Sequence, residues 1–248
     1  MPRENEDRSA AMKTLFVTGA SSDIGLSIIR RVSGEYDLIW AHYLHWSDRL
    51  DLIQAELGEK IHWLQADLTQ PEALGAMINS IRDSGMEPDH IIHLPMPKVF
   101  TQRFLKTPWK DFEAGWEMAL RSAVILLQAF LPHMQKQKSG KIILMLTSYT
   151  IGMPPKYQSA YVTVKYALLG LMKSLAVEYA DKGITFNAVS PEMMDTKYIA
   201  ELPHLLVEQV AASRPEGRIL TVDEVAPTFV YLLSASADHI TGENILIS

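Results

Sequence analysis

The sequence predicts a single α/β domain built on a doubly wound, mostly parallel sheet. Short apolar runs alternate with helical patterns along the whole chain. Several of these runs lack polar residues at alternate positions, which is typical of strands covered by helices on both faces. No block rich in Pro, Gly or Ser divides the 248 residues. Connections of this length imply right-handed crossovers, so we expect ligands at the carboxyl ends of the strands.

Seven apolar runs predict the strands of this sheet. In chain order they are Thr14–Val17, Leu38–Ala41, Ile61–Gln65, His90–Leu94, Lys141–Leu146, Thr185–Val189 and Asn244–Ile247.

Helical patterns fill the connections between these runs. The clearest one ends before Gly183 and repeats apolar residues at helical spacing, namely Leu168, Leu171, Met172, Leu175, Ala176 and Tyr179. It belongs to one of two long helices that we expect at about 109–137 and 159–181. Two further helices are expected to open with capping boxes, Thr69 with Glu72 and Thr221 with Glu224.

Composition excludes several classes of protein. Lys and Arg total 23 against 29 Asp and Glu, a formal charge of −6, so we expect neither nucleic acid nor a membrane as a partner. Cysteine is absent, which rules out disulfides, thiolate nucleophiles and zinc–thiolate sites. The eight histidines show no metal-ligand spacing, so no metal site is expected. Redox chemistry would require a bound organic cofactor.

The first twelve residues are polar and charged, and we expect them to form a disordered tail before a domain at 13–248. They have no apolar centre of the kind that a secretory signal needs. No run approaches the roughly 20 consecutive apolar residues of a bilayer span. These features predict a cytoplasmic protein.

The turn after the first strand carries a candidate phosphate site. It reads Thr18-Gly19-Ala20-Ser21-Ser22-Asp23-Ile24-Gly25 and leads into an apolar helix. Glycines allow backbone amides to approach a phosphate closely, and the helix directs its positive end toward that charge. An ordinary tight turn between strand and helix remains the alternative for this segment taken alone.

Tyr161 and Lys165 lie four residues apart at the start of the last long helix, so their side chains share one face. A nearby ammonium is expected to lower the tyrosine pKa from its reference value near 10, which would make Tyr161 a proton donor. Ser148 follows the fifth predicted strand, where its hydroxyl is placed to hold a substrate oxygen, with Thr147 as the alternative. A solvated lysine above an aromatic ring would show the same spacing.

Further short motifs follow other strands. They are Asp67-Leu68, Pro191-Glu192-Met193-Met194-Asp195-Thr196 and the closing Ile240-Thr241-Gly242-Glu243. In this order, together with the glycine turn and Tyr161-Val162-Thr163-Val164-Lys165, they resemble the motifs of the short-chain dehydrogenase/reductase family. The resemblance runs from the first strand to the last residue, although the usual Gly-Gly tail is missing.

The resemblance implies a Rossmann-type domain in which Ser148, Tyr161 and Lys165 are catalytic. Tyr161 would act as acid and base, Ser148 would orient a carbonyl, and Lys165 would hold the nicotinamide ribose of a bound dinucleotide. The residues that the resemblance assigns to this cofactor are Thr18, Gly19, Ser21, Ser22, Ile24, Gly25, Asp67, Leu68, His93, Tyr161, Lys165, Pro191, Met194 and Thr196.

The sequence departs from the family pattern around the cofactor. Asp23 replaces a glycine near the diphosphate, where two like charges about 5 Å apart cost roughly 3 kcal/mol at an effective dielectric near 20. Ser22 stands where members that prefer NADP often carry a basic residue. The segment 42–47 lacks the acidic residue that selects NAD, which favours NADP. His42 or His45 is a candidate phosphate contact there, although a solvated loop histidine is the commoner case.

The family pattern also changes near the reacting groups. The segment His93-Leu94-Pro95-Met96 replaces the family's Asn-Asn-Ala-Gly, and Ala119 replaces its fourth catalytic residue, an asparagine. Glu192 replaces the glycine after Pro191 and adds a second carboxylate. These changes weaken both the cofactor cradle and the proton supply to Tyr161.

Two hypotheses follow. The first is an NADP(H)-dependent reductase of small or carrier-bound carbonyl compounds that resembles 3-oxoacyl carrier-protein reductases. The second is a divergent member that has lost productive dinucleotide binding and serves a non-redox or partner-binding role. The substrate pocket is expected at Met96, Tyr149, Met153, Tyr157 and a lid at 193–213, which favours an apolar ligand unless these residues only pack together. The resemblance also implies a homodimer or homotetramer through the two long helices.

Overall fold

The computed structural model describes residues 12–98, 101–199 and 204–248. Except for Met12, the expected N-terminal tail lies outside the described residues. Seven strands form one sheet in the order β3-β2-β1-β4-β5-β6-β7, and every neighbouring pair is parallel. The prediction of a parallel, doubly wound sheet is therefore confirmed. The strands are β1 Thr14–Thr18, β2 Leu38–Tyr43, β3 Ile61–Gln65, β4 His90–His93, β5 Gly140–Met145, β6 Ile184–Pro191 and β7 Asn244–Ile247.

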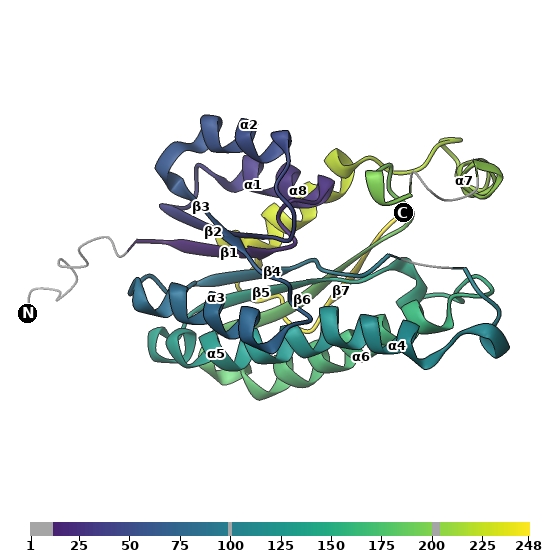
Figure 1. Cartoon of the computed structure of the whole chain (residues 1–248). Coiled ribbons are helices and arrows are strands. Elements are labelled where there is room, and N and C mark those ends of the chain that lie inside the picture. Colours follow the sequence, from purple (N-terminus) through teal and green to yellow (C-terminus); the bar gives the residue numbers. More distant parts are fainter. Residues whose placement is uncertain (1–11, 99–100, 200–203) are drawn as a thin grey trace, which may run out of the picture.

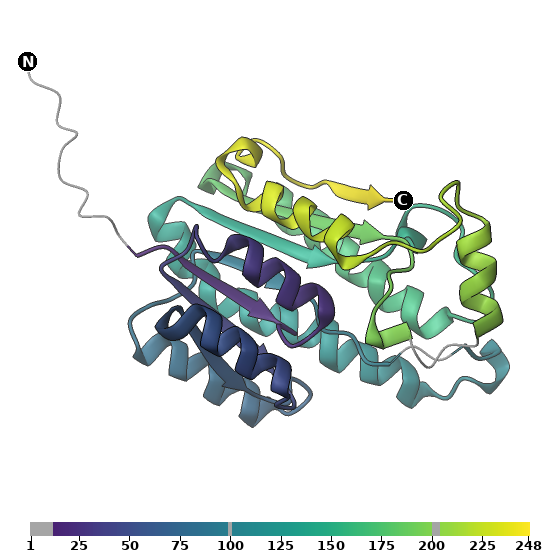
Figure 2. The same ribbon diagram turned by 90° about the horizontal axis from the view of Figure 1, so that it is seen from above.

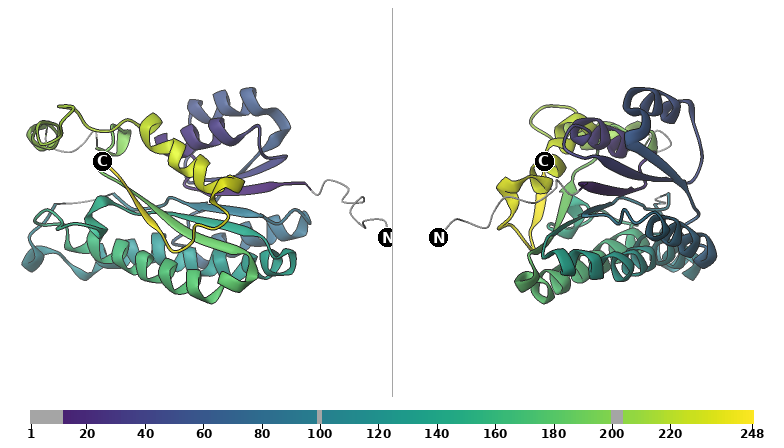
Figure 3. Two further views of the ribbon diagram at one scale, coloured as in Figure 1. Left: turned by 180° about the vertical axis from the view of Figure 1, so that it is seen from behind. Right: turned by 90° about the vertical axis from the view of Figure 1, so that its left-hand side faces the viewer.

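Helices cover both faces of the sheet, as Figures 1 and 2 show. One layer holds α1 (Asp23–Val32), α2 (Asp48–Leu57) and α8 (Val222–Leu233). The other layer holds α3 Pro71–Asp83, α4 Trp109–Gly115, α5 Ser122–Gln137 and α6 Ser159–Glu178. The helix α7 (His204–Ala212) stands apart at the end of the molecule where the strands terminate, as Figure 1 and the left view of Figure 3 show.

Each central strand sends alternate side chains into the two cores, because neighbouring residues of a strand point to opposite faces. In β1, Leu15 and Val17 join the core under α1 and α8, whereas Phe16 joins the core under α5. The rings of Phe16 and Phe130 meet edge to face with centroids 6.0 Å apart. Apolar residues on both faces explain why the predicted strands lack polar alternation.

The two long predicted helices form, with one irregularity. A π-helical stretch, Trp116–Arg121, joins α4 to α5, so the helix that starts at Trp109 is not regular throughout. The helix α6 buries Leu168, Met172 and Ala176 from the predicted apolar stripe. The segment from Trp109 to Gln137 and the helix α6 are both long and apolar enough to span a membrane by composition alone. Both pack against the core of the sheet, and core helices commonly pass that test.

One of the two predicted capping boxes is wrong. Thr221 and Glu224 form theirs at the start of α8. The helix α3, however, begins at Pro71 with Gln70 as its N-cap, so Thr69 lies one residue too early to cap it. The hydroxyl of Thr69 instead donates to Asp67 Oδ1 at 2.7 Å.

Candidate functional site

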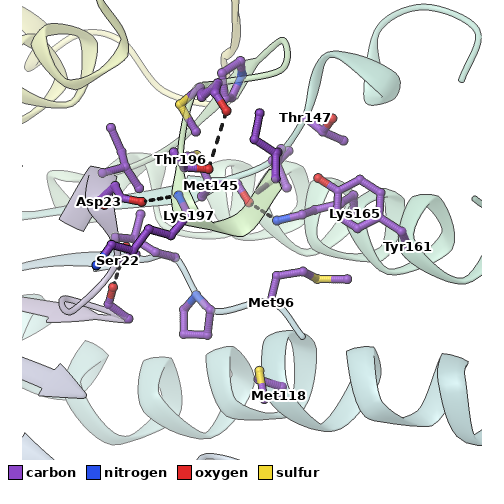
Figure 4. Close-up of a pocket in the computed structure, with 18 of the residues that line it drawn as sticks. Ser22, Asp23, Met96, Met118, Met145, Thr147, Tyr161, Lys165, Thr196 and Lys197 are labelled. Atoms are coloured by element: carbon purple, nitrogen blue, oxygen red, sulfur yellow. Dashed lines mark hydrogen bonds between the residues drawn. The ribbon is translucent and has the colours of Figure 1, made fainter. Parts of the chain in front are cut away.

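A cavity of about 500 Å³ opens at the carboxyl ends of the strands, which is where ligands bind in open parallel sheets. Its walls come from the connections after β1 to β6 and from the start of α6. Figure 4 shows Ser22 and Asp23 on one side of this space and Tyr161 and Lys165 on the other. The candidate phosphate turn and the candidate catalytic residues therefore share one cavity.

The β1–α1 turn has the shape of a phosphate cradle. Gly19 adopts a φ of +70°, and a Cβ there would lie 3.3 Å from Leu94 Cβ. A Cβ on Gly25 would lie only 2.6 Å from the Ala20 carbonyl oxygen. Ser22 Oγ accepts from the Gly25 amide at 3.1 Å and donates to the Gly19 carbonyl at 2.7 Å. Close packing of backbone at a helix N-terminus fits the diphosphate of a dinucleotide.

His42 supports this turn from β2, and both of its ring nitrogens are hydrogen-bonded within the protein. It is buried, its Nδ1 accepts from the Gly19 amide at 3.0 Å, and its Nε2 donates to the Ala66 carbonyl at 2.9 Å. Burial lowers the pKa of His42, although the Ala66 hydrogen bond opposes this change. The neutral imidazole thus joins the connections after β1 and β3, and the expectation of a solvated loop histidine is wrong for His42.

Asp23 does not face the phosphate position as an isolated charge. Its Oδ1 lies 2.7 Å from Arg49 Nη2 in α2, and its Oδ2 accepts from the Lys197 amide at 2.8 Å. Arg49 and Lys197 also line the cavity. The like-charge penalty expected from the sequence is therefore offset by a cation that sequence reasoning missed. Arg49 is 26 residues from Asp23, and no local pattern signals the contact.

His93 lies behind the cavity wall. Its Nε2 donates to the Ala119 carbonyl in the π-helical stretch at 2.9 Å, and its Nδ1 accepts from the Thr18 hydroxyl at 2.8 Å. Burial lowers the pKa of His93 to about 3, so the ring is neutral. Neither Thr18 nor His93 is among the residues that line the cavity. Both hold β1, β4 and the π-helical stretch together.

Lys165 and Tyr161 face the cavity side by side on α6, as their spacing predicts (Figure 4). Lys165 Nζ donates to the Met145 carbonyl at 2.7 Å and lies 5.7 Å from the centre of the Tyr161 ring. Burial lowers the pKa of Lys165 to about 7. Burial also raises the pKa of Tyr161 to about 12, against a hydrogen bond with Thr147 that lowers it.

The predicted acidification of Tyr161 is therefore wrong for this state of the protein. A lysine lowers a neighbour's pKa only through its charge, and burial favours the neutral forms of both side chains. The side chain that hydrogen-bonds Tyr161 is Thr147, the alternative considered from the sequence. Ser148 lines the same cavity and begins the short 3-10 turn after β5. Tyr149 packs edge to face on Tyr161, with ring centroids 6.4 Å apart.

The remaining predicted residues divide into two groups. The first group lines the cavity and consists of Gly19, Ser21, Ser22, Ile24, Asp67, Leu68, Ser148, Tyr161, Lys165, Pro191, Met194 and Thr196. The second group, Thr18, Gly25 and His93, supports the cavity from behind. The hydroxyl and the amide of Thr69 donate hydrogen bonds to the Asp67 carboxylate, and these bonds lower the pKa of Asp67. Among the residues expected in the substrate pocket, Met96, Tyr149 and Met193 line the cavity. Met153 is 94% exposed instead, and Tyr157 lines a separate small pocket.

The segment after β6 closes one side of the cavity. Met193 and Asp195 exchange backbone hydrogen bonds with Leu220, and Arg214 pairs with Glu192. This ion pair neutralises the carboxylate that replaces the family glycine. Part of the expected lid, residues 200–203, lies outside the described residues.

A family model described as enoyl-(acyl carrier protein) reductase matches residues 19–248. The chain belongs to the short-chain dehydrogenase/reductase family of oxidoreductases. It is 25% identical to a D-beta-hydroxybutyrate dehydrogenase of Rhizobium meliloti, over 94% of this chain and 96% of that one. It is 27% identical to a 3-oxoacyl-acyl-carrier-protein reductase of Staphylococcus epidermidis, over 95% and 97% of the two chains.

Solved structures share the fold. The structure of ElxO with NADP bound superposes with a TM-score of 0.85 at 23% identity, over 96% of this chain and 97% of that one. A levodione reductase superposes with a TM-score of 0.86 at 20% identity, over 95% and 96% of the two chains.

Proposed function

We propose that this protein is an NADP(H)-dependent carbonyl reductase that converts a ketone to an alcohol. The observation that carries the proposal is that Tyr161, Lys165, Thr147 and Ser148 converge in the same cavity as the β1–α1 phosphate cradle. A 3-oxoacyl group is the first substrate to assay, because relatives at this level of identity include 3-oxoacyl-acyl-carrier-protein reductases.

The roles proposed for these residues follow from the family resemblance and from the cavity that the residues share. The amides of the turn from Gly19 to Gly25 would hold the diphosphate, Asp67 and Leu68 would border the adenosine, and Pro191, Met194 and Thr196 would border the nicotinamide. When bound, the dinucleotide supplies the hydride. Ser148 or Thr147 would hold the carbonyl oxygen of the substrate, and Tyr161 would donate a proton to it. The raised pKa of Tyr161 keeps its hydroxyl protonated at neutral pH, the form that a reduction requires.

Arg49 supports the preference for NADP. It lines the end of the cavity beside β2 and β3, where Leu44 and His42 stand and no acidic residue from the β2–α2 connection is available for a ribose hydroxyl. A guanidinium matches a phosphate through two parallel hydrogen bonds. The structural relative ElxO is described with NADP bound, which agrees with this choice.

A second candidate is a divergent member that binds a dinucleotide poorly. One observation favours this candidate. Ala119 stands at the position of the family's fourth catalytic residue, and its carbonyl accepts a hydrogen bond from His93. The structure weakens another argument for this candidate, since Asp23 is paired with Arg49. We favour the reductase.

The proposal is tested by Tyr161→Phe in a steady-state assay with NADPH and a panel of 3-oxoacyl thioesters and small ketones. Loss of a positioned proton donor is expected to lower kcat by about 10²- to 10⁴-fold. Ser148→Ala and Thr147→Val, assayed in parallel, show which hydroxyl holds the carbonyl, because that variant alone should lose kcat. An unchanged kcat in Tyr161→Phe contradicts the acid role of Tyr161.

A further inference from the structure

Asp23 makes a contact that crosses the cavity from one wall to the other. Its carboxylate belongs to the start of α1, which follows β1, and it accepts a hydrogen bond from the Lys197 amide, which follows β6 (Figure 4). The strands β4 and β5 separate β1 from β6 in the sheet. Three interstrand spacings amount to about 14 Å, so the Asp23–Lys197 contact spans the carboxyl ends of β4 and β5.

The cavity continues on both sides of this contact. Arg49 and Asp67 line it beyond β1, toward β2 and β3, while Tyr161 and Lys165 line it beside β5. Asp23 and Lys197 also line it, after β1 and after β6 respectively. An elongated ligand that reaches from Asp67 to Lys165 must therefore pass this contact.

Neighbouring residues hold both partners of the Asp23–Lys197 contact in place. On the side of α1, Arg49 Nη2 lies 2.7 Å from Asp23 Oδ1, which leaves Oδ2 for the Lys197 amide. On the other side, the chain before Lys197 is anchored, because the Asp195 amide donates to the Leu220 carbonyl at 2.7 Å. The residue Asp23 is 20% exposed at its side chain, so solvent screens its hydrogen bonds only in part.

We propose that the Asp23 carboxylate and the Lys197 amide form a clasp that closes over the middle of a bound dinucleotide, and that its opening limits release of the dinucleotide. Arg49 is a positioning residue that orients the carboxylate. The proposal rests on the function proposed above. It gives the aspartate a role that a glycine at this position lacks, since glycine has no side chain to reach the Lys197 amide.

The first test needs no dinucleotide. Amide hydrogen exchange is measured by NMR at Lys197 in the wild type, in Asp23→Ala and in Asp48→Asn. Asp48 is an exposed acidic residue in the first turn of α2, so its variant removes an equal charge nearby without touching the clasp. We expect faster exchange at Lys197 in Asp23→Ala alone, by about 10- to 100-fold, as for loss of a hydrogen bond to a charged group. Equal exchange in all three proteins overturns the clasp.

The second test measures release directly. NADPH is displaced from each protein with excess oxidised cofactor while its fluorescence is followed by stopped flow. We expect release to be about 10- to 100-fold faster in Asp23→Ala than in the wild type or Asp48→Asn, as for loss of a hydrogen bond to a charged group.

Two results separate the clasp from the proposed function. If Asp23→Ala binds NADPH more tightly and releases it more slowly, the carboxylate only repels the diphosphate and the clasp is wrong, while the function stands. If the wild type binds no dinucleotide, the proposed function fails and the clasp over a dinucleotide fails with it. Asp23→Asn, which keeps the size of the side chain but removes its charge, provides a second variant should Asp23→Ala not fold.

Discussion

Burial sets the charge of the reactive side chains in the free protein. Lys165 is 2% exposed, and it donates a hydrogen bond to the Met145 carbonyl, which carries no negative charge to balance an ammonium. Its ammonium form is therefore unfavourable, while the same environment keeps the Tyr161 hydroxyl protonated. The i, i+4 spacing predicts that the two side chains share a face, but spacing carries no information on how dry that face is. For this reason the sequence-based pKa prediction has the wrong direction.

The lowered pKa of Lys165 predicts how stability changes with pH. Between about pH 7 and pH 10 the unfolded chain binds a proton at this lysine and the folded chain does not, so the free energy of unfolding rises with pH. Above pH 10 the raised pKa of Tyr161 reverses the trend, because only the folded chain then keeps the tyrosine proton.

Urea unfolding of the wild type and Lys165→Met at pH 7, 8 and 9 checks the lysine contribution. The variant should lose the part of the upward slope that Lys165 supplies, and at pH 7 it should be the more stable protein. Parallel stability curves for the two proteins would show that Lys165 keeps an ordinary pKa.

The sequence alone does not predict contacts between residues that are far apart in the chain. Arg49 beside Asp23, and His42 between the connections after β1 and β3, depend on the order of strands in the sheet rather than on any local pattern. By contrast, the residues that form local motifs, such as the turn at Gly19 and the hydroxyls after β5, lie where their motifs predict.

At the scale of elements, the sequence predicts strands and helices well where a single physical rule acts. Apolar runs give all seven strands, because both faces of the sheet are covered. The capping prediction at Thr69 fails, because two rules compete there. Proline is favoured at the first helical position, and Pro71 takes that position in α3 and moves the N-cap to Gln70.

Gly183, the predicted stop after α6, gives a test at this scale. Its φ is +70°, and a Cβ there would lie 2.2 Å from the Lys138 carbonyl oxygen. We expect Gly183→Ala to lower the free energy of unfolding by about 1–3 kcal/mol through backbone strain and the clash.

Gly170→Ala is the matched control. Gly170 lies inside α6 with open space around the added methyl group, so the same substitution should stabilise the protein by about 0.5–1 kcal/mol. Chemical denaturation of both variants measures the two changes. Equal effects of the two substitutions would contradict the assignment of Gly183 as a required left-handed position.

At the scale of the whole molecule, sheet topology decides where the site lies. The carboxyl ends of β1 to β6 meet along one edge, so side chains from across the chain line one cavity there. Parallel strands alone predict this edge. They do not predict that the segment after β6 folds back over it, since that depends on the contacts of Leu220, Arg214 and Asp23.

The central claim is that this cavity binds a nicotinamide dinucleotide with its phosphates at the β1–α1 turn. Calorimetric titration of the wild type with NADPH and NADH tests it most directly, with Arg49→Met as the companion variant. We predict micromolar binding of NADPH, about tenfold weaker binding of NADH, and loss of that difference in Arg49→Met. No heat with either dinucleotide, in the wild type and in Asp23→Gly alike, would contradict it.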